Sequence, residues 1–268
     1  MAISVLEAKA KWVRQQALEM VARSGKGHIG GSFSCAEILV SLYYDGILRY
    51  DPKNPDWEDR DRFILSKGHA CPALYPILAD VGYFPLSDLD TYCQEGSIFE
   101  GHANGKVPGI ELTTGSLGHG LGIGVGLALA AKLDDKKYRT FVLLGDGECY
   151  EGSVWEAANF ASHHKLDNLI AIVDRNQQCV LDFTEDCNKL EPFAQKWGAF
   201  GWHYLCIDGH SYHALNTALQ IVHITDKPLV IIANTIKGKG VSFMEKNLIW
   251  HHQIPNEEEL QQARGELK

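Results

Sequence analysis

Residues 139–178 read RTFVLLGDGECYEGSVWEAANFASHHKLDNLIAIVDRNQQ, and they combine two apolar segments with a helical one. Residues 139–144 are short and apolar, as in a buried strand, and they run into a glycine-rich turn. A helical pattern follows from 151 to about 165, and a second apolar strand is predicted at 169–173. A strand, a helix and a strand in this order form a right-handed crossover between parallel neighbours. The segment therefore predicts an α/β fold with a mainly parallel sheet and helices on both faces.

Polar residues follow both predicted strands. Asp146 stands between Gly145 and Gly147 after the first strand, and Asn176 comes after the second. Because the carboxyl ends of parallel strands share one edge of the sheet, where open α/β folds bind ligands, we expect the two side chains to converge. A carboxylate and an amide oxygen suit Mg²⁺, which keeps further positions for phosphate oxygens. The pair predicts a metal-bound diphosphate, although either motif alone is also typical of a turn or a strand end.

The composition is ordinary for a globular α/β protein. Of the 268 residues, 45% are hydrophobic and 22% are charged, which predicts a single domain over 1–268 with a C-terminal tail at about 241–268. The 34 acidic and 25 basic residues give a net charge of −9, and lysines and arginines do not cluster. Nucleic acid and anionic membranes are therefore not expected as partners.

Cysteine usage and hydropathy predict the compartment. Seven cysteines are scattered without CxxC or metal-ligand spacing, so we expect reduced, mostly buried thiols. The first residues mix charged and apolar positions, unlike a signal peptide, and no apolar run approaches the length of a membrane span. Together these features predict a cytoplasmic protein.

Helical and strand patterns alternate along the rest of the chain. An opening helix is expected to end at Ser24, a flexible glycine-rich loop is expected at 25–31, and Ser34 is expected to cap the next helix. Further helices are predicted at 35–44, 70–81, 87–94, 121–133, 189–197, 211–224 and 256–268, and further strands at 62–65, 204–207 and 229–233. This alternation agrees with the α/β fold.

Several loops combine glycine with histidine or lysine. His28, His69 and His102 stand beside glycines, which leave an imidazole room to face a ligand, although a single loop histidine is more often a surface group. Lys237 and Lys239 follow the last predicted strand in a KGKG loop. Their charge is what a diphosphate or sugar phosphate requires.

A run of glycines between residues 113 and 126 has two parts. The first, TTGSLGHG, is predicted to be a loop at the start of a helix, where exposed amides can contact a cofactor. The second, at 122–126, predicts a tightly packed helix that needs small residues.

The order of these motifs resembles a known family. Asn176 lies 30 residues after Asp146 (176 − 146), a spacing similar to that of the thiamine diphosphate enzymes. The motifs GHIGG, LSKGHA, EGHAN, TTGSLGHG, GDGECYEG, DRN, KGKG and WH resemble the amino-terminal half of transketolase over almost the whole chain. The resemblance implies a thiamine diphosphate-binding fold with Mg²⁺, or Ca²⁺ or Mn²⁺ in its place. It also implies transfer of a two-carbon ketol unit from a ketose (phosphate) to an aldose (phosphate), with the cofactor as electron sink.

The same resemblance assigns roles to individual residues. Asp146, Asn176 and the backbone carbonyl of Gln178 would hold the metal. The expected cofactor-binding residues are His69, Gly115, Ser116, Leu117, Asp146, Gly147, Glu151, Asn176, Lys237 and His251, of which Glu151 would lie near a subunit contact. The expected catalytic residues are His28, His69, His102 and His251, because imidazoles exchange protons near neutral pH.

The chain departs from the family pattern in two ways. His119 stands where many relatives have glutamine, and Arg175 and Gln177 flank Asn176 where asparagine or lysine is usual. These differences are expected to affect substrate preference more than metal binding. The sequence also stops where transketolase continues into its pyrimidine-binding domain. We therefore expect a separate C-terminal subunit that supplies this domain and the activating glutamate, in an α₂β₂ assembly.

Two alternatives to a transketolase subunit stay open at this point. One is the α subunit of a 2-oxo acid dehydrogenase, or a deoxyxylulose phosphate synthase-like enzyme, which has less need of several hydroxyl-binding histidines. The other is a non-catalytic scaffold with the same fold, against which the presence of both Asp146 and Asn176 argues. The sugar is open as well, since general pentose phosphate metabolism and specialised pathways for unusual or sulfonated sugars both fit.

Overall fold

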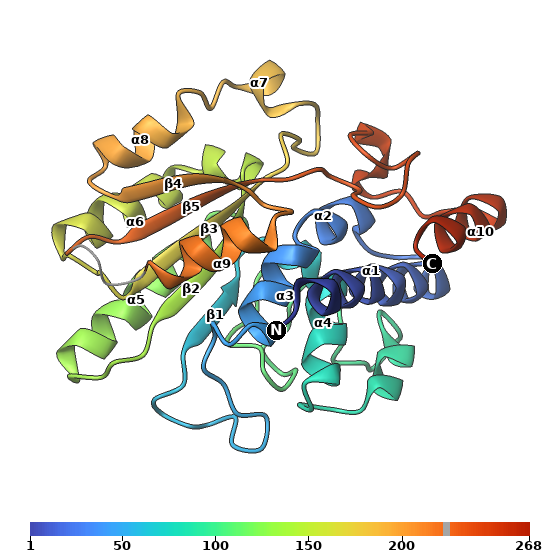
Figure 1. Cartoon of the computed structure of the whole chain (residues 1–268), viewed down its shortest axis with the longest axis horizontal. Helices are drawn as coiled ribbons and strands as arrows, with labels where there is room; N and C mark the ends of the chain where they lie inside the picture. The colour runs from blue at the N-terminus through green and yellow to red at the C-terminus, as the bar shows by residue number, and fades with distance from the viewer. Residues whose placement is uncertain (222–225) are drawn as a thin grey trace.

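A five-stranded parallel sheet lies at the centre of the computed structural model, which describes residues 1–221 and 226–268 (Figure 1). The strands are β1 (Arg62–Leu65), β2 (Thr140–Gly145), β3 (Leu169–Arg175), β4 (His203–Asp208) and β5 (Leu229–Asn234). Their order is β1-β2-β3-β5-β4, and each adjacent pair is parallel. The predicted α/β fold with a mainly parallel sheet is confirmed.

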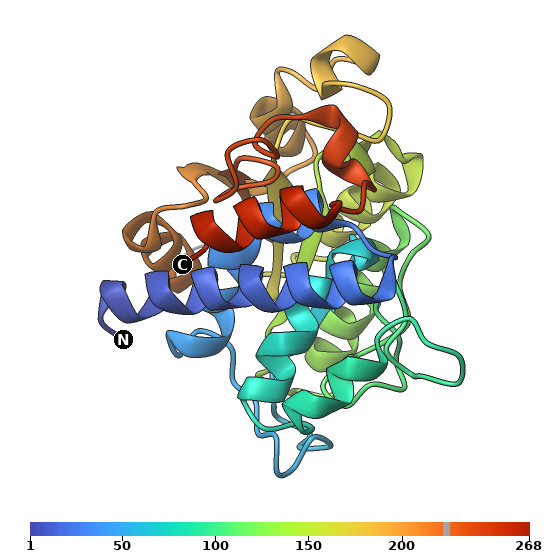
Figure 2. The ribbon, with the colours of Figure 1, turned by 90° about the vertical axis from the view of Figure 1, so that its right-hand side faces the viewer.

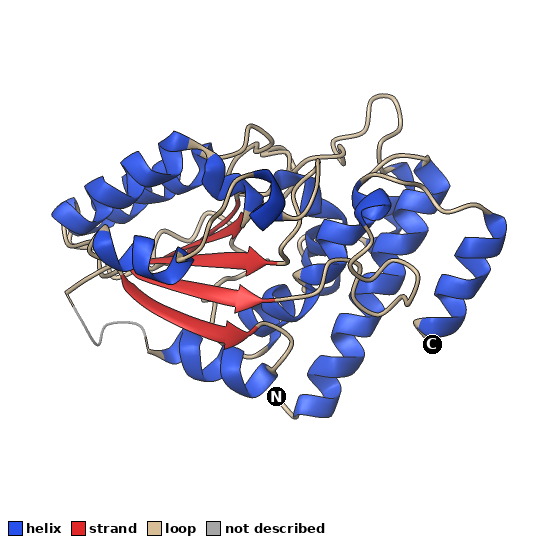
Figure 3. Ribbon diagram, turned by 90° about the horizontal axis from the view of Figure 1, so that it is seen from above, coloured by secondary structure: helices blue, strands red, loops and turns tan. Residues whose placement is uncertain are grey.

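Helices cover both faces of this sheet (Figure 3). The α-helices are α1 (Ile3–Ser24), α2 (Ile29–Ser34), α3 (Ala36–Tyr44), α4 (Cys71–Asp80), α5 (His119–Leu133), α6 (Gly152–His163), α7 (Thr184–Cys187), α8 (Phe193–Ala199), α9 (Tyr212–Gln220) and α10 (Glu257–Glu266). Short 3-10 helices are η1 (Gly68–Ala70), η2 (Leu86–Thr91), η3 (Gly147–Tyr150) and η4 (Leu248–His251).

The two faces of the sheet form two separate hydrophobic cores. Because successive strand residues point to opposite faces, Phe141 and Leu143 of β2 pack with helices α1, α3 and α4, whereas Val142 and Leu144 pack with α5 and α6. Fully buried strands of this kind read as continuous apolar runs. This is why the apolar segments of residues 139–178 predict β2 and β3 correctly.

The C-terminal helix α10 lies along the opening helix α1 (Figure 2). Arg264 pairs with Glu19 at 2.7 Å, and Gln15 donates from Nε2 to the carbonyl oxygen of Leu267 at 2.6 Å. Asn256 caps α10 with its side chain, as part of a capping box. The segment predicted as a tail thus contributes to the core that surrounds α1.

The first glycine-rich loop is shorter than its composition suggests. Helix α2 begins at Ile29, inside the predicted loop of residues 25–31. The prediction that Ser34 caps the following helix is wrong, because its hydroxyl donates instead to Asp174 Oδ2 at 2.6 Å.

The region after β3 also differs from the prediction. Helix α7 was not predicted, and α8 begins at Phe193 rather than at 189 because Pro192 disfavours a helical conformation at Glu191. The helix predicted at 211–224 is observed as α9, and residues 222–224 of that prediction lie outside the described residues.

The glycines of α5 have two different environments. A Cβ on Gly124 would lie 2.5 Å from Val142 Cγ2, so close packing of the helix on the sheet requires glycine there. Gly122 and Gly126 face outward and a Cβ on either would meet nothing within 4 Å. The prediction of tight packing is therefore confirmed for Gly124 and wrong for the other two, because only one face of α5 contacts the sheet.

Candidate active site

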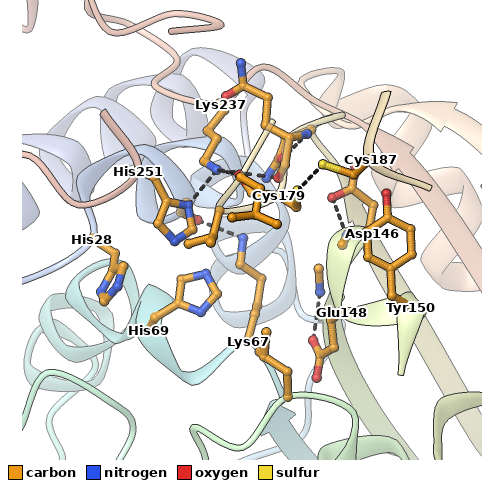
Figure 4. A pocket seen from close by; sticks show the side chains of 18 of the residues that line it. His28, Lys67, His69, Asp146, Glu148, Tyr150, Cys179, Cys187, Lys237 and His251 are labelled. Atoms are coloured by element: carbon orange, nitrogen blue, oxygen red, sulfur yellow. Dashed lines mark hydrogen bonds between the residues drawn. The ribbon is translucent and has the colours of Figure 1, made fainter. Parts of the chain in front are cut away.

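The carboxyl ends of β2 and β3 lie side by side, since Gly145 pairs in register with Asp174. Asp146 is the first residue after β2, and Asn176 is the first after β3. Strand β3 extends through Arg175, two residues beyond the prediction, because its end pairs with β5. Both polar residues line one cavity of about 570 Å³, a volume typical of small-molecule sites (Figure 4).

Three donors hold the Asp146 carboxylate. Oδ1 accepts from the Gly147 amide at 2.8 Å, and Oδ2 accepts from the Gln177 amide at 2.6 Å and from Arg175 Nη1 at 3.1 Å. Burial raises the pKa of Asp146 to about 6, and the Arg175 charge opposes this shift. A second cation beside this carboxylate would further favour its charged form.

The amide groups of Asn176 and Gln178 add oxygens to the same wall. Asn176 donates from Nδ2 to Asp174 Oδ2 at 3.3 Å, while its Oδ1 accepts from the Gln178 amide at 3.1 Å. Both polar atoms of the Gln178 side chain are buried and have no hydrogen-bond partner among the described residues, a condition that a polar ligand would relieve. Nowhere in the described ranges do three His, Cys, Asp or Glu side chains group as metal ligands, so a metal here would depend on Asp146 together with amide and carbonyl oxygens.

Lys237 places an ammonium group in the cavity wall. Its Nζ donates to the carbonyl oxygens of Gln178 at 3.4 Å and Cys179 at 3.3 Å, and lies 2.8 Å from His251 Nδ1. Burial lowers the pKa of Lys237 to about 8, and the Lys67 charge adds to this shift. The carbonyl that the sequence predicts as a metal ligand is thus contacted by a cation within the protein.

The predicted histidines gather around His28. The ring centroid of His28 lies 5.1 Å from that of His69, 5.7 Å from His102, 5.4 Å from His251 and 4.7 Å from His252. Burial lowers the pKa of His28 to about 4 and that of His251 to about 3, and it also lowers the pKa values of His69 and His102. The rings of His28, His69, His102 and His251 are therefore neutral near pH 7. The Nδ1 atom of His28 is buried without a partner among the described residues.

Three charged residues of this region were not predicted from the sequence. Lys67 and Asp174 form a buried ion pair behind the strand ends, and Glu148 accepts from the backbone amides of Gly118 and Gly145, both at 2.9 Å. Lys67 and Glu148 line the cavity (Figure 4). Lys67 stands in the LSKGHA motif and Glu148 in the GDGECYEG motif, so the motifs contained both residues. Their partners Asp174 and Gly118 lie 107 and 30 positions away, which local patterns do not show.

The remaining predicted residues divide into two groups. Gly115, Leu117 and Gly147 line the cavity. Ser116 is exposed, with its hydroxyl 3.3 Å from a ring nitrogen of His119, and Glu151 is exposed at the start of α6. Neither of these two belongs to the cavity wall.

Arg175, one of the departures from the family pattern, links β3 to the segment that follows it. Its guanidinium donates to Asp146, to the Thr184 hydroxyl at 2.6 Å, to Glu185 at 2.9 Å and to Glu191 at 3.2 Å. The arginine thereby holds the chain of residues 184–191 against the candidate metal ligand.

Comparisons with known proteins agree on one family. Residues 6–267 match the family described as transketolase, thiamine diphosphate binding domain. The chain is 44% identical over 268 residues to an apulose-4-phosphate transketolase subunit of Phocaeicola vulgatus, covering 100% of this chain and 95% of that protein. It is 44% identical over 265 residues to a 6-deoxy-6-sulfo-D-fructose transketolase subunit of a Clostridium species, covering 98% and 96%.

Solved structures give the same result. The transketolase of Campylobacter jejuni superposes with a TM-score of 0.94 at 34% identity, over all of this chain and 43% of that one. Within the described residues, no helix is long and apolar enough to cross a membrane.

The chain belongs to the transketolase family of transferases, and it corresponds over its whole length to a transketolase subunit with a thiamine diphosphate-binding domain.

Proposed function

We propose that this chain is the diphosphate-binding subunit of a split transketolase, which transfers a two-carbon ketol unit from a ketose (phosphate) to an aldose (phosphate). The observation that carries the proposal is a single cavity whose wall combines strand-end oxygens, the Lys237 ammonium and several imidazoles. The oxygens and the ammonium suit a metal-bound diphosphate, and the imidazoles suit the hydroxyls of a sugar.

Thiamine diphosphate with Mg²⁺, or with Ca²⁺ or Mn²⁺ in its place, is the proposed cofactor pair. The Asp146 carboxylate, Asn176 Oδ1 and the Gln178 carbonyl would hold the metal, and Lys237 would balance the charge of the diphosphate. When bound, the cofactor supplies the electron sink for cleavage beside the ketose carbonyl. The unpartnered side chain of Gln178 supports a polar ligand at this position.

The imidazoles are proposed to bind and orient the sugar. Because the pKa values of His28 and His251 lie well below 7, both rings are neutral and each offers one nitrogen as an acceptor. His28 Nδ1, which lacks a partner among the described residues, can accept a hydrogen bond or a proton from a substrate hydroxyl. His69 and His102 complete the proposed catalytic set.

A separate C-terminal subunit is part of the proposal. Relatives that match over nearly their whole length, such as the two described above, are named as transketolase subunits, whereas this chain covers 43% of the Campylobacter jejuni transketolase chain. The partner would supply the pyrimidine-binding domain and the activating glutamate, in a cytoplasmic α₂β₂ complex. Mixing experiments test this: activity should require both chains, and light scattering should give the mass of two copies of each. Full activity of this chain alone would contradict it.

The donor sugar can be identified with a substrate panel. The relatives are named for apulose 4-phosphate and for 6-deoxy-6-sulfo-D-fructose, and a solved transketolase is described with sedoheptulose 7-phosphate. Turnover of these ketoses, compared with pyruvate and a dye acceptor, separates a specialised or general transketolase from a 2-oxo acid enzyme. If thiamine diphosphate and Mg²⁺ bind neither to this chain nor to its complex, the scaffold alternative is favoured.

Two variants test the residue assignments. Asp146→Ala should abolish metal-dependent cofactor binding in calorimetry while the circular dichroism spectrum stays unchanged. His28→Ala should bind the cofactor normally and lose turnover. Unchanged cofactor affinity in the first variant, or normal turnover in the second, would remove that residue from its proposed role.

A further inference from the structure

The accessible cysteines of the chain are unevenly distributed. All seven cysteines lie in the described residues and are free thiols, and three of them are buried: Cys35, Cys71 and Cys149. The expectation of mostly buried thiols is therefore wrong, because the other four lie in loops, at a helix end or on the edge strand β4. Two of these four, Cys179 and Cys187, have their sulfur atoms only 3.3 Å apart (Figure 4).

The backbone, rather than a chance side-chain contact, brings this pair together. The chain turns back after β3 through an antiparallel bridge between Gln178 and Phe183, and the Cys179 amide donates to the Asp182 carbonyl at 3.0 Å. Helix α7 then ends at Cys187. The turn and helix α7 thus bring both cysteines together within nine consecutive residues, 179–187.

Both sulfur-bearing residues belong to the wall of the candidate active site. A Cβ on Gly147 would lie 2.9 Å from Cys179 Cβ, so Cys179 packs directly on the turn that carries Asp146. Thiolates are soft ligands, whereas Mg²⁺ prefers oxygen, so the proposed metal site does not account for two cysteines here.

We propose that Cys179 and Cys187 are an oxidation site that forms a reversible intramolecular disulfide. With a peroxide as oxidant, one thiolate attacks a peroxide oxygen, the O–O bond breaks, and hydroxide leaves while the sulfur becomes a sulfenic acid. The second thiolate attacks that sulfur, the S–S bond forms, and the S–O bond breaks with loss of another hydroxide. The two thiol protons convert both hydroxides to water, and the two electrons lost by the sulfurs reduce the peroxide. A small dithiol reverses the reaction by exchange.

The surrounding turn can accommodate the bond. A disulfide has an S–S length of about 2.05 Å, so the sulfurs must approach by roughly 1.3 Å from their present separation. Val180 and Leu181, between the two cysteines, are 64% and 80% exposed, so the turn can move without disturbing either core. Disulfides of intracellular proteins are commonly transient and redox-sensing, which agrees with an exposed pair beside a ligand cavity.

Peroxide titration of the reduced full-length chain tests this proposal. Free thiols are alkylated after oxidation under native conditions, and the peptides are mapped by mass spectrometry. We expect two thiols to be lost together, with a peptide linking Cys179 to Cys187 whose mass is lower by two hydrogen atoms. Dithiothreitol should restore both thiols.

Single variants provide the matched controls. Cys187→Ser should leave Cys179 as a sulfenic acid that dimedone traps, and Cys179→Ser should do the same for Cys187. Cys206→Ser removes an exposed thiol on β4 and should leave the linkage unchanged. The proposal is overturned if no linked 179–187 peptide forms, or if Cys206 is oxidised as readily as the pair.

Discussion

The variant Asp174→Asn tests the buried ion pair that supports the strand ends. The side chains of Lys67 and Asp174 are 1% and 0% exposed, and the carboxylate also accepts from the Ser34 hydroxyl at 2.6 Å. Removal of one partner of a buried pair leaves the other charge uncompensated, which costs about 3–5 kcal/mol. We expect the free energy of unfolding to fall by about that amount, a large share of the roughly 5–15 kcal/mol of a typical domain.

The same variant should change the pH dependence of stability. In the natural chain, burial acts to lower the pKa of Lys67, but the charge and hydrogen bond of Asp174, together with the nearby Cys35 and Asp146, outweigh it and raise the pKa. Stability from this lysine is therefore lost only as the pH rises through that raised value. Without the carboxylate, burial lowers the pKa of Lys67 in the folded state below its ordinary value of 10.5. The folded variant then binds fewer protons than the unfolded chain, so its stability should increase as the pH rises toward 10.5.

Urea unfolding at several pH values measures both effects, provided that the m value stays constant. Asp226→Asn is the matched control, because it removes an ion pair with Lys165 whose side chains are 69% and 70% exposed, and it should cause no measurable change. Adding Lys67→Met to Asp174→Asn should recover part of the lost stability, since no unpaired charge then stays buried. A loss below about 1 kcal/mol for Asp174→Asn would refute the reasoning, as would a double variant as unstable as the sum of the singles.

Burial alone would raise the pKa of Glu37, but the charges and hydrogen bonds of Arg14 and His210 together outweigh it and lower the pKa to about 2. The stability that this carboxylate contributes is present above its ordinary pKa of 4.5 and is lost as the pH falls toward 2. The variant Glu37→Gln should therefore show a weaker loss of stability in acid when urea unfolding is measured at several pH values. Identical pH dependence in the variant and the natural chain would contradict this. The variant Gly124→Ala should lower the free energy of unfolding by about 1–3 kcal/mol, because the added methyl group overpacks against Val142. The variant Gly122→Ala should leave the free energy of unfolding unchanged or raise it by up to about 1 kcal/mol. Equal Tm values for the two variants would contradict this difference. The disulfide-linked chain should bind thiamine diphosphate and Mg²⁺ several-fold more weakly than the reduced chain in calorimetry, because the cavity wall moves; equal affinities would exclude such an effect.

The fold could be predicted from local periodicity because its strands are buried on both faces. The continuous apolar runs at residues 139–144 and 169–173 are typical of strands buried on both faces of a parallel sheet. They correspond to β2 and β3 within two residues at each end. Helix α5 follows from the same kind of pattern. Its outward glycines were misjudged because glycine spacing alone does not tell which face of a helix meets the sheet.

Helix α2 shows where local signals fail. Glycine disfavours helix, so the GHIGG segment predicts a loop. In the structure, a Cβ on Gly30 would lie 2.7 Å from the Trp250 carbonyl oxygen, and one on Gly31 would lie 3.2 Å from His69 Nε2. Close packing against residues far away in sequence requires glycine at position 30 and leaves little room for a side chain at position 31. Tertiary contacts therefore override the local propensity.

The residue types of the candidate site could be predicted from motifs, but the balance of their charges could not. Lys237 and Lys239 occupy the same glycine loop and are equivalent cations in the sequence, yet Lys239 lies 3.6 Å from Glu245 near the surface. Lys67 is neutralised by Asp174, which is 107 positions away, and the order of the strands brings the two together. Lys237 has no carboxylate within ion-pair distance among the described residues, which is why burial lowers its pKa while that of Lys67 is raised. Among the described residues, Lys237 is thus a buried ammonium in the cavity wall without an ion-pair partner, and a bound anion would compensate its charge. This property arises from the pairing of all three lysines and not from any single motif.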